Sequence, residues 1–512
     1  MVRSSEPQNE NKELFSADNP RGKAVKWCSV PLSDVILNRN RLDASVFDIE
    51  TKQVRNRIMD GKYGFVYFGG ENGIIEDACY PGRFKRVYCK KGNGEAFYLP
   101  SQMLDIYPKT DKYISKSTKC NMDELRLKQN TLLLTRSGTI GNISLVSKTM
   151  EGKVFSDDVI RITFQQECDL GYMYAFFKTK AGKMMLTTNG YGSVITHLEP
   201  EHLAAIPVPD APIRLRQKIN GLITQSYRLR DESNKIIDMA TAYLAKELQL
   251  PDIEAFDVSL YHPEASVETY SVKLSDMEGR FDASYHAPIV PAITEHLKEF
   301  SKEVAMVGDS RISKEIILPG RFKRVYVEEG YGIPFFGGKN IGELDPSDKK
   351  YLSFSRHGKK IKDELTIREG MILITCSGTV GNIALVPKHW DGWAMTHDII
   401  RLVPCDGIAG YVYIWLQTVY ANAMLKACSY GSVVSHIEKE HLCHIPVPML
   451  KDKNAQMQIN NLALQANRKR YEAYELERQA IEVMEREALC EEGRKEDGGG
   501  KDEGKTSASW RG

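Results

Sequence analysis

Two long stretches of this chain place apolar or small residues three and four positions apart on an otherwise polar background. They run from about 213 to 248 and from about 455 to 489. The positions are Leu215, Ile219, Leu222, Ser226, Leu229, Ile236, Ala240 and Tyr243 in the first stretch, and Ile459, Leu462, Ala466, Ala473, Leu476, Ala480 and Val483 in the second. The spacing predicts two long helices with a heptad-like seam. A narrow seam must be buried, and the simplest partner is the other helix.

The rest of the chain carries short apolar runs that predict strands. "TLLLT" (131–135) and "MILIT" (371–375) are rich in Leu and Ile and are followed by Ser-Gly-Thr turns. This composition, bounded by Gly, Ser and Asn, is typical of β-strands. An "IPVP" stretch then precedes each long helix. Its prolines predict an end to regular structure.

All these elements occur twice, in the same order. "PGRFKRVY" is identical at 81–88 and 319–326. The other matched segments are "RLDAS" (41–45) with "RFDAS" (280–284), "SGTIGN" (137–142) with "SGTVGN" (377–382), "SDDVIRI" (156–162) with "THDIIRL" (396–402), and "YGSVITHLEPEHLAAIPVP" (191–209) with "YGSVVSHIEKEHLCHIPVP" (430–448). Their offsets lie between 238 and 240. The chain is therefore a tandem duplication of a unit of about 240 residues.

The duplication predicts the division of the chain into domains. We expect a disordered lead, a globular domain, a long helix, a linker, a second globular domain, a second helix and a disordered tail. The boundaries are 1–27, 28–210, 211–250, 251–271, 272–449, 450–490 and 491–512.

Composition narrows the class of protein. The formal net charge of the 512 residues is +1, so binding to nucleic acid would need local basic patches. The chain has no apolar run near the roughly 20 residues that span a bilayer, and no signal-peptide core is visible. The ten cysteines show no CxxC spacing. We expect reduced thiols in a cytosol.

Motifs for catalysis are missing from the sequence. We find no glycine-rich loop for a nucleotide or methyl donor after a strand, no HExxH and no nucleophile elbow. The "GGKDEGKT" at 499–506 fits the phosphate-loop pattern by chance, because a charged stretch precedes it instead of a buried strand. Asp157 and Asp158 could form a catalytic carboxylate pair. The second copy has His397 and Asp398 instead, which favours a structural role.

Histidines recur at one spacing in both copies. His197 and His202 bracket "HLEPEH", and His436 and His441 bracket "HIEKEH". We interpret them as polar residues at the start of a helix. The repeated spacing leaves a metal site open as the alternative.

The repeated octapeptide is the strongest candidate for binding. In an extended segment Arg83 and Lys85 share one face, and Phe84 and Arg86 share the other. Cations anchored by aromatic residues suit a phosphate backbone, whereas a solvated basic edge strand is the alternative. Glycines in the Ser-Gly-Thr turns allow positive φ and close approach of another backbone, which suits a binding turn. The alternative is a hairpin loop that needs glycine for its own geometry. The candidate DNA contacts are Arg83, Lys85, Arg86, Ser137, Thr139 and Asn142, with Arg321, Lys323, Arg324, Ser377, Thr379 and Asn382 in the second copy.

The ordered, duplicated motif set resembles the DNA-specificity subunit of type I restriction–modification systems, over roughly residues 28–490. The resemblance implies an α+β fold with two tandem target-recognition domains, each mixed and β-rich. Two long antiparallel, coiled-coil-like helices would separate them with pseudo-two-fold symmetry. The family often opens each helix with Pro-Leu-x-Glu-Gln, where this chain has "PDAPIRLRQKI" and "PMLKDKNAQMQI".

The same resemblance implies a function. Each domain would read half of a split site in double-stranded DNA, and the helices would bind DNA methyltransferase subunits, two of them, with a restriction or translocase subunit as a further partner. The chain itself would be non-catalytic and without cofactor, since methyl donor and ATP belong to the partners, and would work in a prokaryotic cytoplasm. Candidate partner contacts are the helix residues Gln225, Arg228 and Arg230 and their counterparts Gln465, Arg468 and Arg470.

Differences between the copies bear on the DNA site. Thr51–Cys79 differs from His286–Leu318, and Gly94–Lys119 differs from Gly332–Lys360. Only contacts to base edges carry direct sequence information, so these stretches predict two unlike half-sites and a non-palindromic target. The alternative function is a non-catalytic assembly scaffold of a defence complex that has lost DNA readout.

Overall fold

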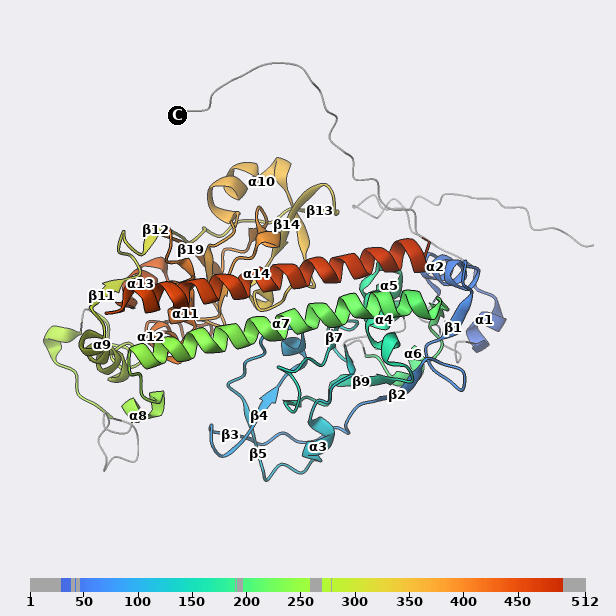
Figure 1. Ribbon diagram of the computed structural model, residues 1–512, viewed down its shortest axis with the longest axis horizontal. Helices are drawn as coiled ribbons and strands as arrows, with labels where there is room; N and C mark the ends of the chain where they lie inside the picture. The colour runs from blue at the N-terminus through green and yellow to red at the C-terminus, as the bar shows by residue number, and fades with distance from the viewer. Residues whose placement is uncertain are drawn as a thin grey trace, which may run out of the picture.

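Two long helices dominate the computed structural model, which describes residues 29–37, 42, 47–188, 190, 197–257, 269–277 and 279–490. They are α7 (Ile213–Glu247) and α14 (Lys453–Val483), and α14 continues into a π-helical turn, η7 (Met484–Ala488) (Figure 1). Both predicted helices are confirmed. The expected disordered ends at 1–27 and 491–512, and the chance phosphate-loop match, lie outside the described residues.

The two helices lie side by side in opposite directions. Lys218, near the start of α7, pairs with Glu487 beyond the end of α14 at 2.9 Å. Glu232, further along α7, pairs with Lys469 near the middle of α14 at 2.7 Å. Residue numbers therefore rise along one helix as they fall along the other. The antiparallel arrangement and the pseudo-two-fold symmetry are confirmed.

The first globular body contains three groups of strands and covers one half of the helix pair. A two-stranded pair precedes two four-stranded sheets, whose orders are β2-β9-β6-β7 and β3-β5-β4-β8. The strands are β1 (Phe65–Tyr67), β2 (Ile75–Cys79), β3 (Tyr88–Cys89), β4 (Gly94–Tyr98), β5 (Tyr113–Ser115), β6 (Leu132–Thr135), β7 (Ile143–Leu145), β8 (Val154–Phe155), β9 (Val159–Phe164) and β10 (Pro207–Pro209). The helices are α1 (Leu32–Leu37), α2 (Ile49–Met59), η2 (Pro100–Leu104), α3 (Met122–Leu125), α4 (Glu167–Lys178), α5 (Lys180–Thr188) and α6 (Pro200–Leu203).

The second body repeats this topology strand for strand. Its sheets have the orders β12-β19-β16-β17 and β13-β15-β14-β18, beside the pair β11-β20. The strands are β11 (Glu303–Met306), β12 (Ser313–Ile317), β13 (Tyr326–Val327), β14 (Gly332–Phe336), β15 (Lys350–Ser353), β16 (Ile372–Thr375), β17 (Ile383–Leu385), β18 (Ala394–Met395), β19 (Ile399–Pro404) and β20 (Pro446–Met449). The helices are α8 (Ile253–Asp257), η3 (Leu274–Asp276), α9 (Ile289–Phe300), η4 (Gly338–Asn340), α10 (Phe354–Lys360), η5 (Ile361–Leu365), η6 (Lys388–Trp390), α11 (Ala409–Gln417), α12 (Val419–Ala427) and α13 (Lys439–Cys443).

Two details of the sequence prediction are corrected. The "IPVP" prolines do not end regular structure, because β10 and β20 each pair antiparallel with one strand, β1 or β11. A strand with a single neighbour leaves its other edge free, so prolines are tolerated there. The buried face of α7 includes Ile223, Ile237 and Leu244 in place of Leu222, Ile236 and Tyr243, because α7 packs on α4 as well as on α14. A helix covered on two sides buries a wider stripe than a two-helix seam does.

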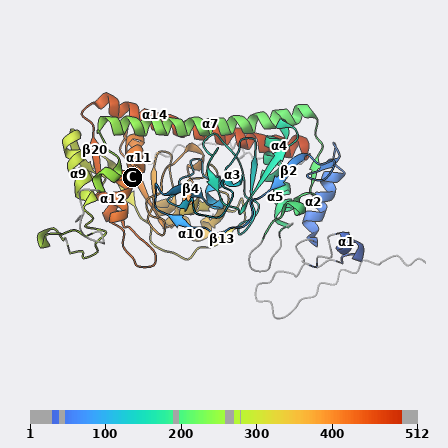
Figure 2. The same ribbon diagram turned by 90° about the horizontal axis from the view of Figure 1, so that it is seen from below.

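Each hydrophobic core draws on both long helices. The start of α7 and the end of α14, including Ala480 and Val483, pack into the core of the first body. The end of α7, including Ala240 and Leu244, packs into the core of the second body with the start of α14. Both bodies lie on the same side of the helix pair (Figure 2). In the part of the chain that the structure describes, no helix is long and apolar enough to cross a membrane.

Candidate nucleic-acid interface

The octapeptides adopt the same conformation in both bodies. Each is an extended segment that enters a strand only at its final tyrosine, Tyr88 in β3 or Tyr326 in β13. The side chains alternate as expected: the first arginine and the lysine are exposed, whereas the phenylalanine and the second arginine are partly buried. The rings of Phe84 and Phe97 meet edge to face at 6.4 Å, and those of Phe322 and Phe335 at 6.5 Å. Buried aromatic residues therefore anchor an exposed basic strip.

Four cations of this strip have no ion-pair partner among the described residues: Arg83, Lys85, Arg321 and Lys323. An exposed cation without a protein anion is free to meet a phosphate. These four side chains are the part of the predicted DNA-contact set that the structure leaves most available.

Arg86 is engaged within the protein. Its guanidinium donates to Asp157 Oδ1 at 2.8 Å and to Ser156 Oγ at 3.0 Å, and it lies 5.5 Å from the ring of Phe97. Only 6% of the Asp157 side chain is exposed. Asp157 thus has the hydrogen-bonding role favoured by the sequence comparison of the two copies.

The counterpart Arg324 meets a different partner. Its Nη2 donates to His397 Nδ1 at 3.2 Å, and it lies 5.6 Å from the ring of Phe335. Burial lowers the pKa of His397, and the nearby Arg324 and Arg321 lower it further. A neutral imidazole can accept this hydrogen bond, so histidine replaces the carboxylate here without losing the contact.

These two arginines offer a matched pair of substitutions. We expect Arg86→Ala to cost about 1–3 kcal/mol of stability, because it leaves the buried Asp157 carboxylate without its cation. Arg324→Ala should cost less, since His397 is uncharged. Urea midpoints of the two variants test this, with the exposed neighbour Lys85→Ala as control. Equal losses in both variants would contradict the assigned roles.

The Ser-Gly-Thr turns are held from inside by a threonine. Thr135 Oγ1 donates to the carbonyl of Thr139 at 2.7 Å and accepts from the Asn142 amide at 3.1 Å. Thr375 bonds in the same way to Thr379 and Asn382. Gly138 and Gly141 have φ of 79° and 84°, as predicted. Thr139 and Thr379 are exposed at the turn tips, whereas Ser137 and Ser377 are partly buried and form β-bridges to His197 and His436.

The repeated histidines connect other motifs. His441 Nδ1 accepts from the Glu438 amide at 2.9 Å at the start of α13, as expected for polar residues that begin a helix. Its Nε2 lies 3.3 Å from Arg280, the first residue of "RFDAS". Among the described residues, no three His, Cys, Asp or Glu side chains converge as they would around a metal ion.

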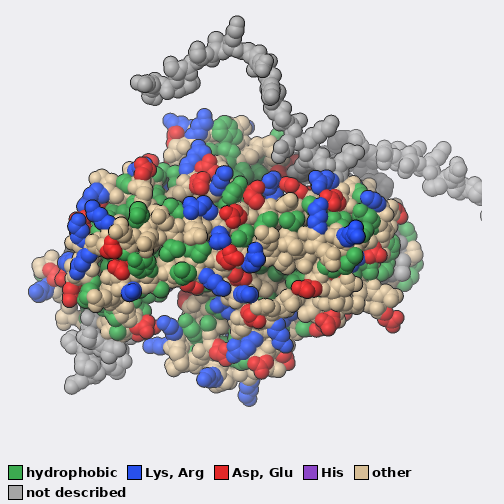
Figure 3. Space-filling model, viewed as in Figure 1, with side chains coloured by type: hydrophobic (Ala, Val, Ile, Leu, Met, Phe, Trp, Pro, Cys, Tyr) green, Lys and Arg blue, Asp and Glu red, His purple; other side chains and the backbone are tan. Residues whose placement is uncertain are grey.

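The helix residues expected to bind partners fall into two groups. Gln225, Arg228, Gln465 and Arg468 are exposed. Arg230 is instead buried and paired with Glu477 of α14, and the partly buried Arg470 donates to Tyr413 at 3.2 Å. In Figure 3, which shows the face of the molecule with the long helices, basic and acidic side chains are interspersed. The helical period agrees with this separation, because residues two positions apart lie on opposite sides of a helix, and Arg230 and Arg470 lie one turn beyond the seam residues Ser226 and Ala466.

Two features were missed by the sequence analysis. The first is α10, which has no equivalent in the first body and lies beside the second octapeptide (Figure 1). His357 of α10 accepts from the Val325 amide at 3.1 Å, while Arg356 and Lys359 are exposed. The second is a contact between the two bodies at Asp105 and Glu343. The signal for the second was present in the repeat, since these acidic residues are 238 positions apart, as the octapeptides are.

The chain is similar to known proteins of solved structure. No family model matches the chain, and no curated protein matches its sequence. Two of the similar structures are S subunits. One is the type I restriction–modification system S subunit from M. genitalium, at 12% identity and a TM-score of 0.31, with 83% of this chain and 98% of that chain covered. The other is the HsdS subunit from Thermoanaerobacter tengcongensis, at 13% identity and a TM-score of 0.25, with 82% and 99% covered.

A third similar chain comes from a structure of complex assembly and conformational transition in the type I R-M system. It is 14% identical with a TM-score of 0.26, and the alignment covers 80% of this chain and 95% of that one. Type I systems are also the family that the motif order of the sequence resembles. TM-scores and identities this low carry no argument about function, which has to come from the residues of the chain itself.

Proposed function

We propose that this chain is the DNA-specificity subunit of a type I restriction–modification complex, or of a related modification-based defence complex. It binds a split site in double-stranded DNA and directs methyltransferase subunits to it. The observation that carries the proposal is the pair of identical basic strips. Each is anchored on the same sheet of an equivalent body, and the antiparallel helices join both bodies in one frame.

Two readers on a shared frame explain why the unit is duplicated. A protein that engages both halves of a site at once gains affinity from the second contact without a second search. Fixed spacing between the readers also becomes part of the specificity, as in dimeric DNA-binding proteins. The exposed strips supply sequence-independent phosphate contact, which orients the protein on the duplex.

The differences between the bodies support two unlike half-sites. α10 lies in the variable stretch 332–360, and its exposed Arg356 and Lys359 are next to the second basic strip. The matching stretch of the first body has no such helix. We propose that α10 contributes to base readout by the second domain alone.

The exposed helix residues support two copies of a partner. Gln225 and Arg228 lie in the first half of α7, and Gln465 and Arg468 lie at the equivalent places of α14. Because the helices are antiparallel, the two pairs lie on opposite sides of the midpoint of the frame. A pseudo-two-fold surface of this kind offers one docking site per half. Methyl donor, ATP and catalysis belong to the partners in this proposal, including any restriction or translocase subunit.

Selection of bound DNA from a random pool tests the proposal. The full chain is purified together with a methyltransferase subunit from the same host, and the bound sequences are determined. We expect a motif with two unlike halves and a constant gap. A stable complex that enriches no sequence would favour the assembly scaffold, and identical half-sites would overturn the assignment of the variable stretches.

A further inference from the structure

The two globular bodies touch each other through one repeated element. Asp105 in the first body and Glu343 in the second are equivalent residues of the repeat, and they pair with each other in an antiparallel β-bridge. The amide of Ile106 donates to the carbonyl of Gly342 at 2.8 Å. A residue that pairs with its own counterpart lies on the two-fold axis, as in a symmetric dimer interface. The contact therefore marks the pseudo-two-fold axis of the molecule.

Side chains from both bodies and both helices pack around this bridge. Ile106 and its counterpart Leu344 join one apolar cluster with Leu229 of α7 and Ala473 of α14. Asn234 of α7 donates to the Ile106 carbonyl at 2.8 Å. The bridge is thus attached to the middle of the helix pair.

Close approach at the bridge depends on a glycine. A Cβ atom on Gly342 would lie 2.5 Å from Asp105 Oδ1. The first copy has Leu104 at the equivalent position, so the two halves of the contact are not interchangeable. The second body makes room for the carboxylate of the first.

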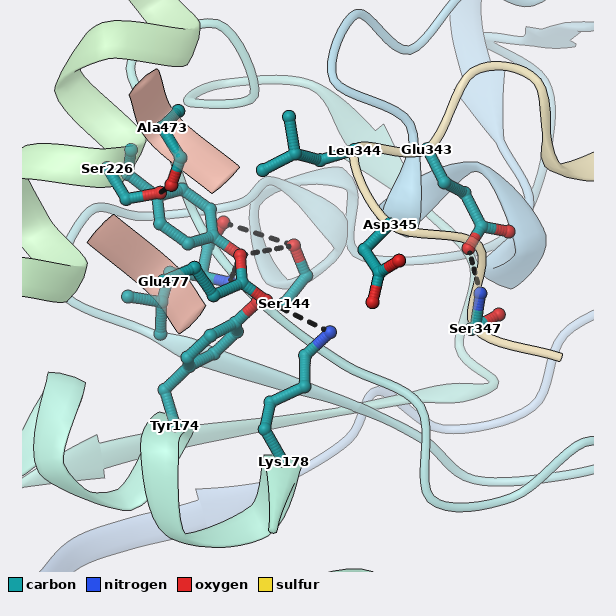
Figure 4. Close-up of polar contacts among 12 residues, drawn as sticks. Ser144, Tyr174, Lys178, Ser226, Glu343, Leu344, Asp345, Ser347, Ala473 and Glu477 are labelled. Carbon is teal, nitrogen blue, oxygen red and sulfur yellow. Dashed lines mark hydrogen bonds and ion pairs between the residues drawn. The ribbon is translucent and has the colours of Figure 1, made fainter. Parts of the chain in front are cut away.

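The bridge brings together two acidic side chains that form no ion pair with the described residues. Glu343 accepts from Asn340 Nδ2 at 2.6 Å and from the Ser347 amide at 2.8 Å (Figure 4). The charged groups around the pair are Lys178 of α4, Arg230 and Asp238 of α7, Glu477 of α14, and Asp345. Lys178 and Arg230 are both paired with Glu477.

Burial therefore favours protonation of the pair. It raises the pKa of Asp105 to about 7, and the Glu343 carboxyl adds to this effect. Burial also raises the pKa of Glu343. A carboxyl group that is desolvated beside a second carboxyl group is protonated more readily than one in water.

A short stretch of chain connects the bridge to the sheet that carries each basic strip. In the first body β3 begins at Tyr88, the last residue of the octapeptide, and lies in one sheet with β4. The short helix η2 then connects β4 to Asp105. In the second body β13, β14 and η4 lead to Glu343 in the same way. We propose that Asp105 and Glu343 form a protonated clasp that sets the separation of the two DNA-reading domains, and hence the gap of the split site. The role in DNA spacing rests on the proposed function, whereas the clasp does not.

Hydrogen exchange of the full chain without DNA tests the clasp. The Ile106 amide should be protected, because opening requires the bodies to separate. The closed form holds one proton more than the open form between about pH 4 and pH 7. After correction for the intrinsic exchange rate, protection should fall by about tenfold per pH unit in this window and level off above it. Asp105→Asn should make protection independent of pH.

Disulfide formation gives a second measure that does not depend on pH. Residues paired across an antiparallel bridge have Cα atoms about 4.5–5.5 Å apart, within the range of a disulfide. Asp105→Cys/Glu343→Cys should cross-link under mild oxidation, whereas each single variant should not, because its new thiol has no cysteine paired with it across the bridge. An unprotected Ile106 amide or failure to cross-link would overturn the clasp. Equal pH dependence in Asp105→Asn would overturn the protonation of Asp105 in the closed form.

The role in spacing is tested on DNA libraries in which the gap is randomised. Wild type and the oxidised double-cysteine variant should select the same single gap. Gly342→Leu, which carries the residue of the first copy, should open the clasp and accept gaps that differ by one base pair or more. An unchanged gap in a variant whose Ile106 amide has lost protection would overturn the spacing role. Failure of the wild type to select DNA would reject the proposed function and leave the exchange result standing.

Discussion

Replacing Arg83, Lys85, Arg321 and Lys323 together by alanine is expected to weaken binding to every DNA sequence by about 10²–10³-fold at physiological salt. These four cations are exposed on the octapeptides and have no ion-pair partner among the described residues. Each phosphate contact contributes about 0.9 to the slope of log affinity against log salt, so the slope should fall by roughly three to four. Fluorescence anisotropy over a salt series measures both quantities.

A control with the same loss of charge separates this effect from net charge. Lys298, Arg311, Lys314 and Arg478 are exposed and paired with acidic residues away from the octapeptides. Their joint replacement by alanine should change the slope little. A loss in the octapeptide variant that is confined to one base position would indicate base readout, and no loss would make the octapeptide a solvated edge segment.

Glu477→Ala is expected to be the most destabilising single substitution in the helix pair. Glu477 lies buried between the helices, where it pairs with Arg230 and Lys178 and accepts from Tyr174 Oη at 2.9 Å (Figure 4). Removing one member of a buried ion pair leaves the others uncompensated, at a cost of about 3–5 kcal/mol. Urea unfolding measures the loss, with the exposed Glu472→Ala as control within about 0.5 kcal/mol of wild type. Similar midpoints for both variants would contradict the role of the network.

The same group predicts how stability changes in acid. Burial alone would raise the pKa of Glu477, but Lys178, Arg230 and the bond from Tyr174 outweigh it and lower the pKa to about 2. A depressed folded-state pKa stabilises the native state above the unfolded value. This contribution, about 3 kcal/mol, is lost as the pH falls from about 4.5 toward 2. Glu477→Gln should lack this part of the acid sensitivity.

The copies differ at this network, which shows why the sequence could not reveal it. Glu477 is equivalent to Ile237, and Lys178 to Gln417. A comparison of the two copies therefore does not single out Glu477 or Lys178, although the equivalent of Arg230 is also an arginine, Arg470. Glu477 and Arg230 are 247 positions apart, and only the antiparallel packing of α7 and α14 brings them together. Arg230 stands among the predicted partner contacts because no local feature of the sequence indicates a buried anion opposite it.

Arg86 illustrates the same limit within one domain. Its position on the inner face of an extended segment followed from alternation alone, and the structure confirms that position. Its role depends on Asp157, which is 71 positions away and meets Arg86 across the body. Side-chain periodicity determines which face of an element a residue occupies, but it does not identify the side chain that the residue contacts there.

The duplication, the two long helices, the strands before the Ser-Gly-Thr turns and the glycines with positive φ in those turns could all be predicted from the amino-acid sequence. These features depend on hydrophobic period and on backbone geometry, which neighbouring residues control. In contrast, tertiary packing is needed to show which cations remain free, which partners the buried arginines have, and that Asp105 meets Glu343 on the pseudo-two-fold axis. Such pairings depend on how distant segments pack, because charge burial is settled by the whole environment of a group and not by its position in the chain.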